Sequence, residues 1–235
     1  MVTTVTEQEE IETGVYTLDY AGYRPDPKFV ATATKVTQSA LASRVPPPAR
    51  VLDVGCGAGD FLAVAKALGY EAEGIDISEA SAKICRSRGL NARSGNFLTE
   101  RFSTKFDLIT MWDVVEHLRE PAAFLDRARS LLTDRGYVFA KIPGFGDISV
   151  GLANFWPRSA GTLLGAPSHV QYFDQESLSM LLTRIGYEPE WIDGGAARTP
   201  MTGGSIKRRL AREAHAVIRR ISGDSNLYVA ARPAS

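Results

Sequence analysis

The most informative segment of this sequence is Val51-Leu-Asp-Val-Gly-Cys-Gly-Ala-Gly-Asp-Phe-Leu62. Its first four residues, of which all but Asp53 are apolar, are typical of a short buried strand, and a helix is predicted to begin near Asp60. Between them, three alternating glycines let the backbone turn tightly and approach a ligand closely. Because the first turn of the following helix carries unpaired N–H groups, the loop is predicted to bind a polar or anionic group.

The charges around this loop select among ligands. A dinucleotide-binding loop has the spacing Gly-x-Gly-x-x-Gly, and Asp60 stands here in place of its last glycine. Two carboxylates, Asp60 and Asp53, would repel a pyrophosphate, whereas Asp53 suits a cationic amine, directly or through a water. No Gly-Lys-Ser/Thr follows, which excludes a P-loop. A nucleoside that carries an ammonium group fits this loop better than a nucleotide phosphate.

A second carboxylate, Asp76, ends the next predicted strand seventeen residues after Gly59, where an acid holds the two hydroxyls of a ribose. The glycine loop followed by this acid resembles the class I S-adenosylmethionine-dependent methyltransferases, of the ubiquinone-biosynthesis and natural-product small-molecule type. Two further motifs stand in the order this family has, namely Gly95-Asn-Phe97 and Phe106-Asp-Leu-Ile-Thr-Met-Trp-Asp-Val-Val-Glu-His-Leu118. The resemblance extends from about residue 45 to the end of the chain.

The resemblance implies an α/β, Rossmann-like fold. We expect a mostly parallel sheet of seven strands with the last strand antiparallel, and helices on both faces. The sequence patterns place the strands at 51–54, 72–76, 90–93, 106–111, 136–142, 187–192 and 226–231. They place helices at 27–44, 61–68, 78–88, 122–132 and 175–185.

We expect a single domain, residues 1–235, with three additions to the core fold. These are an N-terminal cap segment and helix (1–45), a lid-like insertion (145–172) and a basic amphipathic helix (203–222). The insertion lacks a clean hydrophobic period, and long irregular connections are usually functional. The basic helix has three alternative roles: contact with a membrane surface, packing on the sheet, or packing in a dimer.

The cofactor contacts follow from the resemblance, position by position. Asp53, Gly55 and Gly57 would hold the methionine part, with Cys56 as a small residue between the glycines. Asp76 would hold the ribose, and Ile77 and Phe97 the two faces of the adenine. Asn96 replaces the usual aspartate, but its amide oxygen can still accept a hydrogen bond from the adenine amino group.

Aromatic residues are expected at the methionine end of the cofactor. Trp112 would contact it by its backbone or its ring, or would be a packing residue instead. An N-terminal segment covers the cofactor in many small-molecule methyltransferases, so its aromatic and basic residues are cap candidates. The alternative is that they pack the first helix onto the core. They are Tyr16, Tyr20, Tyr23 and Arg24.

Removal of a proton from the acceptor would need a base, and His117 and His169 are the candidates, with Tyr172 a weaker one. Each histidine has a structural alternative: His117 braces the loop after the fourth strand, and His169 pins the end of the insertion. His215 lies in the basic helix and is expected to be solvated or structural. We expect no metal, because Glu116, His117 and His169 have no recognisable ligand spacing, although some ubiquinone-type relatives use a divalent ion.

Composition excludes several classes of partner. Lys and Arg together number 27, as do Asp and Glu, so no net charge directs the chain to nucleic acid or a membrane. No run of about eighteen apolar residues occurs, and the polar N-terminus is unlike a signal peptide. The two cysteines have neither metal-binding nor redox spacing. We therefore expect a cytoplasmic monomer or homodimer.

The sequence thus favours S-adenosylmethionine-dependent methyl transfer to a small molecule, with O-methylation in secondary metabolism as the leading hypothesis. N- or C-methylation of a metabolite is the alternative, because the cofactor motifs do not report the acceptor atom. A membrane-associated quinone or lipid methyltransferase would use the basic helix. A non-catalytic relative is disfavoured because the glycine loop and the ribose acid are both intact.

Overall fold

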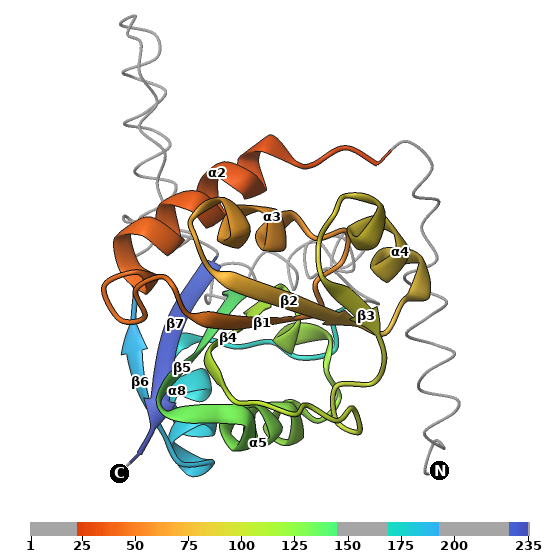
Figure 1. Cartoon of the computed structure of the whole chain (residues 1–235). Coiled ribbons are helices and arrows are strands. Elements are labelled where there is room, and N and C mark those ends of the chain that lie inside the picture. Colours follow the sequence, from red (N-terminus) through yellow and green to blue (C-terminus); the bar gives the residue numbers. More distant parts are fainter. Residues whose placement is uncertain (1–22, 145–168, 193–225, 235) are drawn as a thin grey trace, which may run out of the picture.

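A computed structural model describes residues 23–144, 169–192 and 226–234. These residues build one seven-stranded sheet with the order β3-β2-β1-β4-β5-β7-β6 (Figure 1). The first five strands are parallel to one another, and β7 is antiparallel to both of its neighbours. The strands are β1 (Arg50–Val54), β2 (Glu71–Asp76), β3 (Ala92–Ser94), β4 (Phe106–Trp112), β5 (Leu132–Pro143), β6 (Tyr187–Trp191) and β7 (Asn226–Pro233).

Helices cover both faces of this sheet, as Figure 1 shows. One face carries α2 (Pro27–Val36), α3 (Asp60–Ala67) and α4 (Glu79–Ser87), and the other carries α5 (Pro121–Leu131) and α8 (Gln175–Arg184). Two short helices complete the described elements: the π-helix η1 (Thr37–Leu41), which continues α2, and the 3-10 helix η2 (Val115–His117) after β4. The expected three-layer α/β architecture, with its antiparallel last strand, is confirmed.

Local signals in the sequence explain most of the helix ends. Ser78 accepts a hydrogen bond from the Ser81 N–H and so caps α4, as predicted. Gly69 and Gly89 follow α3 and α4 with positive φ angles, as helix-ending glycines do. Asp174 forms a reciprocal capping box with Ser177 at the start of α8.

Two predicted boundaries differ from the structure by three residues or more. The helix predicted over 27–44 changes to π-helical geometry at Thr37 and ends at Leu41. The fifth strand begins at Leu132, four residues before its predicted start, because that residue is already extended and is buried in the core.

The packing of the sheet brings the ends of three strands together. Strand β1 pairs with β2 on one side and with β4 on the other, all parallel, so their carboxyl ends meet at one edge. The order of the strands reverses between β1 and β4, and ligands of open α/β sheets bind at such a switch point. Apolar side chains of β1, such as Val51 and Leu52, are fully buried on opposite faces and fix the strand in place.

Several predicted features lie outside the described residues. They are Tyr16, Tyr20, His215, most of the lid-like insertion and the basic helix. Within the described ranges, none of the helices is both long enough and apolar enough to cross a membrane.

Candidate active site

The glycine loop is held at the switch point by backbone hydrogen bonds to β2. The N–H groups of Gly55 and Cys56 both donate to the carbonyl oxygen of Ile75, at 2.8 and 3.2 Å. The Gly57 N–H donates to Asp76 Oδ2 at 2.8 Å, and the Ser78 N–H donates to Asp76 Oδ1 at 2.9 Å. The Asp76 carboxylate therefore joins the loop, the end of β2 and the start of α4.

Two of the glycines have different reasons to lack a side chain. Gly55 has a φ of +71°, and a Cβ atom there would lie 2.6 Å from Val114 Cγ2, so close packing requires glycine. Gly57 has a φ of +51°, and a Cβ atom there would meet nothing within 4 Å. The backbone at Gly57 thus borders open space, where a ligand can approach it closely.

Asp53 supplies a buried carboxyl group beside this loop. Its residue is 3% exposed, and the Thr110 hydroxyl donates to Asp53 Oδ1 at 2.6 Å. Burial raises the pKa of Asp53 to about 7, an effect that the Thr110 hydrogen bond opposes and the charge of Asp76 reinforces. Burial also raises the pKa of Asp76, against the two N–H groups it accepts. Both acids would ionise more readily next to a cation.

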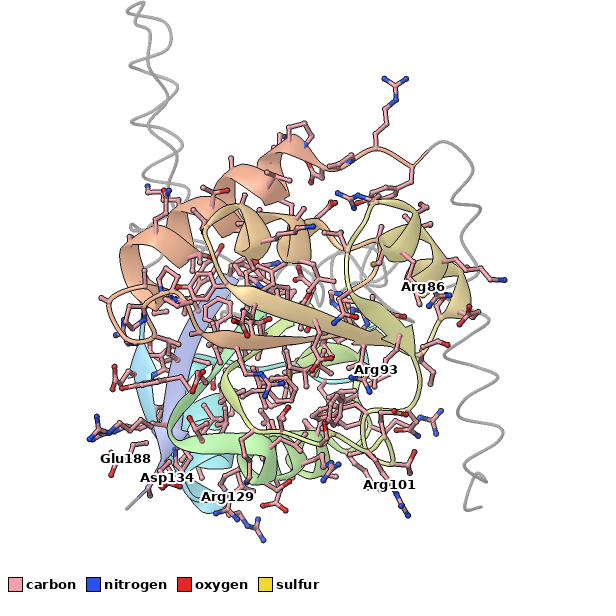
Figure 2. All side chains as sticks on the ribbon, in the orientation of Figure 1. Arg86, Arg93, Arg101, Arg129, Asp134 and Glu188 are labelled. Atoms are coloured by element: carbon pink, nitrogen blue, oxygen red, sulfur yellow. The ribbon has the colours of Figure 1, made fainter. Side chains whose placement is uncertain are left out.

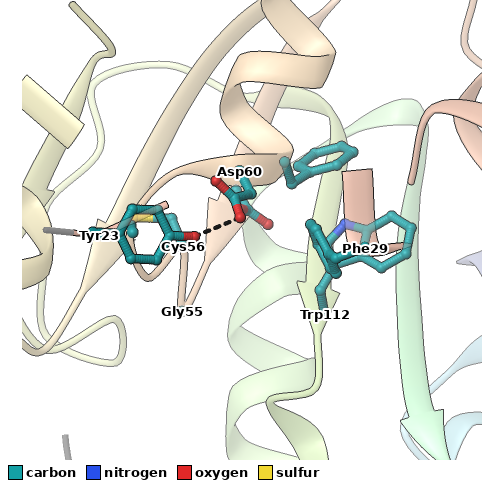
Figure 3. A pocket seen from close by; sticks show the side chains of 9 residues that line it. Tyr23, Phe29, Gly55, Cys56, Asp60 and Trp112 are labelled. Carbon is teal, nitrogen blue, oxygen red and sulfur yellow. Dashed lines mark hydrogen bonds between the residues drawn. The ribbon is translucent and has the colours of Figure 1, made fainter. Parts of the chain in front are cut away.

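A pocket of about 170 Å³ opens beside the loop (Figure 3). Aromatic rings and carboxyl groups share its lining, which consists of Tyr23, Phe29, Asp53, Gly55, Cys56, Ala58, Asp60, Phe61 and Trp112. Its volume is below the roughly 300–1,000 Å³ of drug-sized ligand sites, so it can enclose only part of a nucleoside cofactor. Acidic and aromatic groups together suit a cation.

Trp112 is packed on several sides in this pocket. Its ring centroid lies 5.4 Å from that of Phe29, 5.3 Å from Phe61 and 4.7 Å from Phe139. Its indole Nε1 is buried and has no hydrogen-bond partner among the described residues. The ring therefore serves both as packing and as pocket wall, and its N–H can donate to a bound ligand.

The residues expected around the adenine take different places. Asn96 Oδ1 accepts the Leu98 N–H at 2.9 Å, which leaves one of its two lone pairs for a ligand. The Phe97 ring lies in the core, 3% exposed, with its centroid 5.6 Å from that of Phe124. That burial favours a packing role for Phe97. Ile77, directly after Asp76, is half-buried.

Cys56 lines the pocket but stays a neutral thiol. Its hydrogen bond with Cys85 and its burial raise the pKa of the Cys56 thiol far above the ordinary range. Cys85 Sγ also lies 3.2 Å from the carbonyl oxygen of Gly57. The two thiols pack behind the glycine loop, which fits the expectation that Cys56 is a small structural residue there.

The negative charge of Asp60 is offset by contacts that the sequence did not predict. Tyr23 donates its hydroxyl to Asp60 Oδ2 at 2.5 Å, and Arg88 Nη1 donates to Asp60 Oδ1 at 2.9 Å. Arg88 stands at the end of α4, outside every predicted motif. The ion pair weakens the repulsion that Asp60 would exert on an anion, so Asp53 is the main group that would repel a pyrophosphate.

The catalytic candidates form a second group of side chains after β4. His117 and His169 meet edge to face, with ring centroids 4.9 Å apart. His117 Nε2 lies 3.9 Å from Glu116 Oε1, which is too long for a hydrogen bond. The carbonyl oxygen of Glu116 accepts the N–H groups of Val170 and Gln171, both at 3.0 Å. These two bonds bring His169 to His117 across 52 residues of sequence.

Glu116 is an unusual member of this group, because its side chain is 0% exposed. Neither of its carboxyl oxygens has a hydrogen-bond partner among the described residues. The pKa of Glu116 is raised to about 8, mainly by burial; the charge of Asp113 contributes to this rise, and that of Lys141 opposes it. Asp113 forms an ion pair with Lys141 and has a φ of +53°, which is rare for a residue other than glycine.

The same group has the donor set of a cation site. One ligand atom each from Glu116, His117 and His169 lies within 4.8 Å of the others. Imidazole and carboxylate ligands suit Zn²⁺ and other transition metals, and a buried carboxylate without a donor is a ready ligand. The spacing in the sequence did not show this arrangement, because the fold joins it from two distant segments. Tyr172 is 42% exposed on the segment that follows His169.

Comparison with known proteins agrees with this geometry. A relative from Bordetella avium, named "Ubiquinone biosynthesis O-methyltransferase", is 27% identical over 155 residues, which are 62% of this chain and 64% of that protein. A second protein of that name, from Albidiferax ferrireducens, is 28% identical and aligned over 39% of its length. The chain thus spans less than two thirds of the curated relatives it matches.

Solved structures share the fold at lower identity. A SAM-dependent methyltransferase from Archaeoglobus fulgidus has a TM-score of 0.59 and 22% identity, over 86% of this chain and 94% of that one. Magnesium protoporphyrin IX methyltransferase from Synechocystis PCC 6803, solved with bound SAH, has a TM-score of 0.59 and 15% identity, over 97% and 95%.

The family itself is shown by the sequence. Residues 27–190, most of the chain, match the family described as "Methyltransferase domain". This match covers the glycine loop, Asp76 and both histidines of the second group. The protein therefore belongs to the methyltransferase-domain family.

Proposed function

We propose that this protein transfers a methyl group from S-adenosylmethionine to a small-molecule acceptor, with oxygen as the methylated atom. The observation that carries the proposal is the placement of Asp53 and Asp76 on either side of the glycine loop, at the switch point of the sheet. One acid is buried beside an aromatic pocket and the other ends β2, which suits a ligand with an ammonium and a ribose. The solved relative with bound SAH supports the same cofactor.

Each part of the cofactor has a matching group in the chain. Asp53 and the aromatic pocket would take the methionine part, because a cation offsets the cost of a buried carboxylate. Asp76 would accept the ribose hydroxyls with the lone pairs that its two backbone donors leave unused. Asn96 and Ile77 would border the adenine. Residues 23 and 112 would close the methionine end, where Trp112 can also attract a cation through its ring face.

S-adenosylmethionine would supply an electrophilic methyl group. In an in-line displacement the methyl passes to the acceptor, and the sulfonium of the cofactor becomes a neutral thioether. The main task of the protein is then to align the acceptor with that methyl. Rigid elements surround the pocket: β1, β4 and the first turn of α3 all contribute to its lining. The glycine loop lets the backbone come close without a side chain in the way.

The group formed by Glu116, His117 and His169 would remove the proton from the acceptor. A hydroxyl acceptor must lose its proton for the new bond to form, and a positioned histidine is the commonest base. The edge-to-face contact holds the two imidazoles together, and the Glu116 carbonyl fixes the segment that carries His169. Tyr172 remains a weaker candidate on the same segment.

A divalent cation is the second candidate for the same task, and the buried carboxylate of Glu116 favours it. Glu116, His117 and His169 would hold the ion, which would lower the pKa of a bound acceptor hydroxyl. In that arrangement the histidines bind the ion and are not proton acceptors. Chelation separates the two candidates, because only a reaction that depends on the ion would stop in excess EDTA.

The acceptor class rests on the relatives. The curated relatives are named ubiquinone biosynthesis O-methyltransferases, which favours oxygen and a compact organic acceptor. N- or C-methylation remains the alternative, because none of the cofactor contacts involves the acceptor. We also propose that the protein works in the cytoplasm as a monomer or homodimer, without nucleic acid.

The test is methyl transfer from S-adenosylmethionine labelled in its methyl group. Purified protein would be offered phenols, catechols, amines and activated carbon acids, with an Asp76→Ala variant as the matched control. The proposal predicts label on a hydroxyl compound with the wild type and a large loss with the variant. Transfer only to nitrogen or carbon would contradict the proposed acceptor atom, and equal transfer by the variant would contradict the cofactor site.

A further inference from the structure

Arg88 reaches the glycine loop from outside it. It follows α4, yet its Nη1 donates both to Asp60 Oδ1 at 2.9 Å and to the carbonyl oxygen of Ala58. The side chains of Arg88 and Asp60 are 25% and 11% exposed, so this ion pair is largely shielded from solvent. Partly buried, charge-assisted bonds of this kind hold geometry better than surface ion pairs do.

Tyr23 completes a cluster with the same two residues, which we call the clasp (Tyr23, Asp60 and Arg88). Its hydroxyl donates to Asp60 Oδ2, as the dashed line in Figure 3 marks. Its ring lies under the Arg88 guanidinium, with 5.6 Å from Cζ to the ring centroid, which is cation–π distance. The two oxygens of one carboxylate thus hold a tyrosine and an arginine at once. The three residues come from three segments, and only Asp60 belongs to a predicted strand-loop motif.

The clasp forms part of the pocket wall. Tyr23 and Asp60 both line the pocket, whereas Arg88 lies behind them and does not. Tyr23 lies on the side of Asp60 away from Phe29 and Trp112 (Figure 3). Arg88 therefore acts on the pocket through the lining residues that it contacts, namely Tyr23, Asp60 and the backbone of Ala58.

We propose that Arg88 is a positioning residue that fixes Tyr23 and Asp60 as a closed wall around the bound cofactor. This inference rests on the proposed function, because it takes the pocket to hold the methionine part of S-adenosylmethionine. Arg88 offsets the charge of Asp60, while no described lysine or arginine pairs with Asp53. The pocket then offers one uncompensated acid to a cofactor that carries one net positive charge.

Loss of Arg88 has two consequences in this scheme. Tyr23 loses the partner over its ring and the anchored carboxylate that accepts its hydroxyl, so bound cofactor should leave faster. Asp60 also becomes an unpaired acid in the wall, which favours the cationic cofactor over its neutral product S-adenosylhomocysteine. Both ligands should bind more weakly, and the affinity for S-adenosylhomocysteine should fall more than the affinity for S-adenosylmethionine.

The test compares Arg88→Gln with a matched control, Arg86→Gln. Arg86, labelled in Figure 2, lies on the same helix and forms an exposed ion pair with Glu79, but it contacts neither Asp60 nor the loop. Calorimetry would give the Kd of S-adenosylmethionine and S-adenosylhomocysteine, and stopped-flow displacement would give their dissociation rates. For Arg88→Gln we expect the dissociation rate of S-adenosylmethionine to rise about tenfold and that of S-adenosylhomocysteine to rise more, because a charged hydrogen bond is lost. Arg86→Gln should change either rate little.

Tyr23→Phe keeps the ring and removes only the hydroxyl, so it tests the clasp even if Arg88→Gln is unstable. It should speed dissociation in the same direction, and the double variant should fall short of the sum of the two effects, because the residues share one network. Unchanged dissociation in both single variants, with normal wild-type binding, would overturn the clasp. A wild type that binds neither ligand would instead overturn the proposed function, and the clasp with it.

Discussion

The Asp76 carboxylate accepts the backbone N–H of Gly57 at 2.8 Å, across the gap between the end of β2 and the glycine loop of β1. The residue expected to hold the ribose therefore also sets the shape of the loop expected to hold the methionine part. Its other oxygen accepts the Ser78 N–H, at the start of α4. One side chain thus couples two parts of the cofactor site, and its removal should affect both.

Replacement of Asp76 by alanine should weaken S-adenosylmethionine binding by about tenfold to a hundredfold, since the ribose loses its acceptor and buried donors lose theirs. Asp76→Asn is the matched control, because it keeps one acceptor oxygen and should lose less affinity. Calorimetry would supply the affinities and circular dichroism the state of the fold. Unchanged affinity in a folded Asp76→Ala protein would show that the ribose lies elsewhere.

Replacement of His117 or His169 by alanine should show whether that histidine is the general base or a structural residue. A base variant should lose about a hundredfold or more in turnover and keep its affinity for the cofactor, because general bases contribute about 10²–10⁴-fold. Single-turnover rates and cofactor Kd values would be measured for both variants. If a variant loses both stability and cofactor binding, the replaced histidine has a structural role and is not the base.

Much of this site was accessible from local sequence patterns. Alternating glycines predicted a loop after β1, and Asp76 was predicted at the end of the next strand; both lie at one edge of the sheet because parallel strands end at the same edge. Ser78 was correctly predicted as a helix cap, because its hydroxyl accepts a hydrogen bond from an N–H group of the helix that directly follows it.

The remainder depends on contacts between distant segments, for which the sequence carries no local signal. Arg88 meets Asp60 across 28 residues, and His169 meets His117 across 52. The resemblance predicts Phe97 at the adenine face, and the sequence does not show that its ring also packs against Phe124 in the core. Burial is a tertiary property, so the raised pKa of Glu116 could not be foreseen either.

The pKa of Asp53 predicts opposite effects of pH on stability and on cofactor binding. Its pKa rises from 3.8 to about 7 on folding, so between these values the folded protein keeps a proton that the unfolded chain releases. The contribution of Asp53 to the free energy of unfolding should therefore fall as the pH rises from about 4 to about 7. Affinity for the cationic cofactor should instead rise through pH 7, as Asp53 ionises.

Asp53→Asn isolates this effect from other titrating groups. The variant should be more stable than the wild type at pH 8, because it buries no charge, and it should bind S-adenosylmethionine more weakly there. Denaturant unfolding and calorimetry across pH 5–8 would measure both quantities. A wild type and variant with parallel pH profiles in both measurements would show that Asp53 titrates outside this range.

Chelation distinguishes the two proposed roles of the Glu116 group. If a histidine is the base, methyl transfer should continue in excess EDTA, and Mg²⁺ or Mn²⁺ should leave the melting temperature unchanged. A cation bound to the folded protein would raise the melting temperature by mass action. Loss of transfer in EDTA that Mn²⁺ restores in the wild type, but not in Glu116→Gln, would contradict the base proposal and assign the ion to this site.

Calorimetric titration would show whether the glycine loop, Asp53 and Asp76 bind S-adenosylmethionine. The purified protein would be titrated with S-adenosylmethionine and, in parallel, with NAD, which carries the pyrophosphate that the loop should reject. We predict micromolar binding of S-adenosylmethionine and none of NAD. Binding of NAD, or of neither ligand, would contradict the assignment of this site to S-adenosylmethionine.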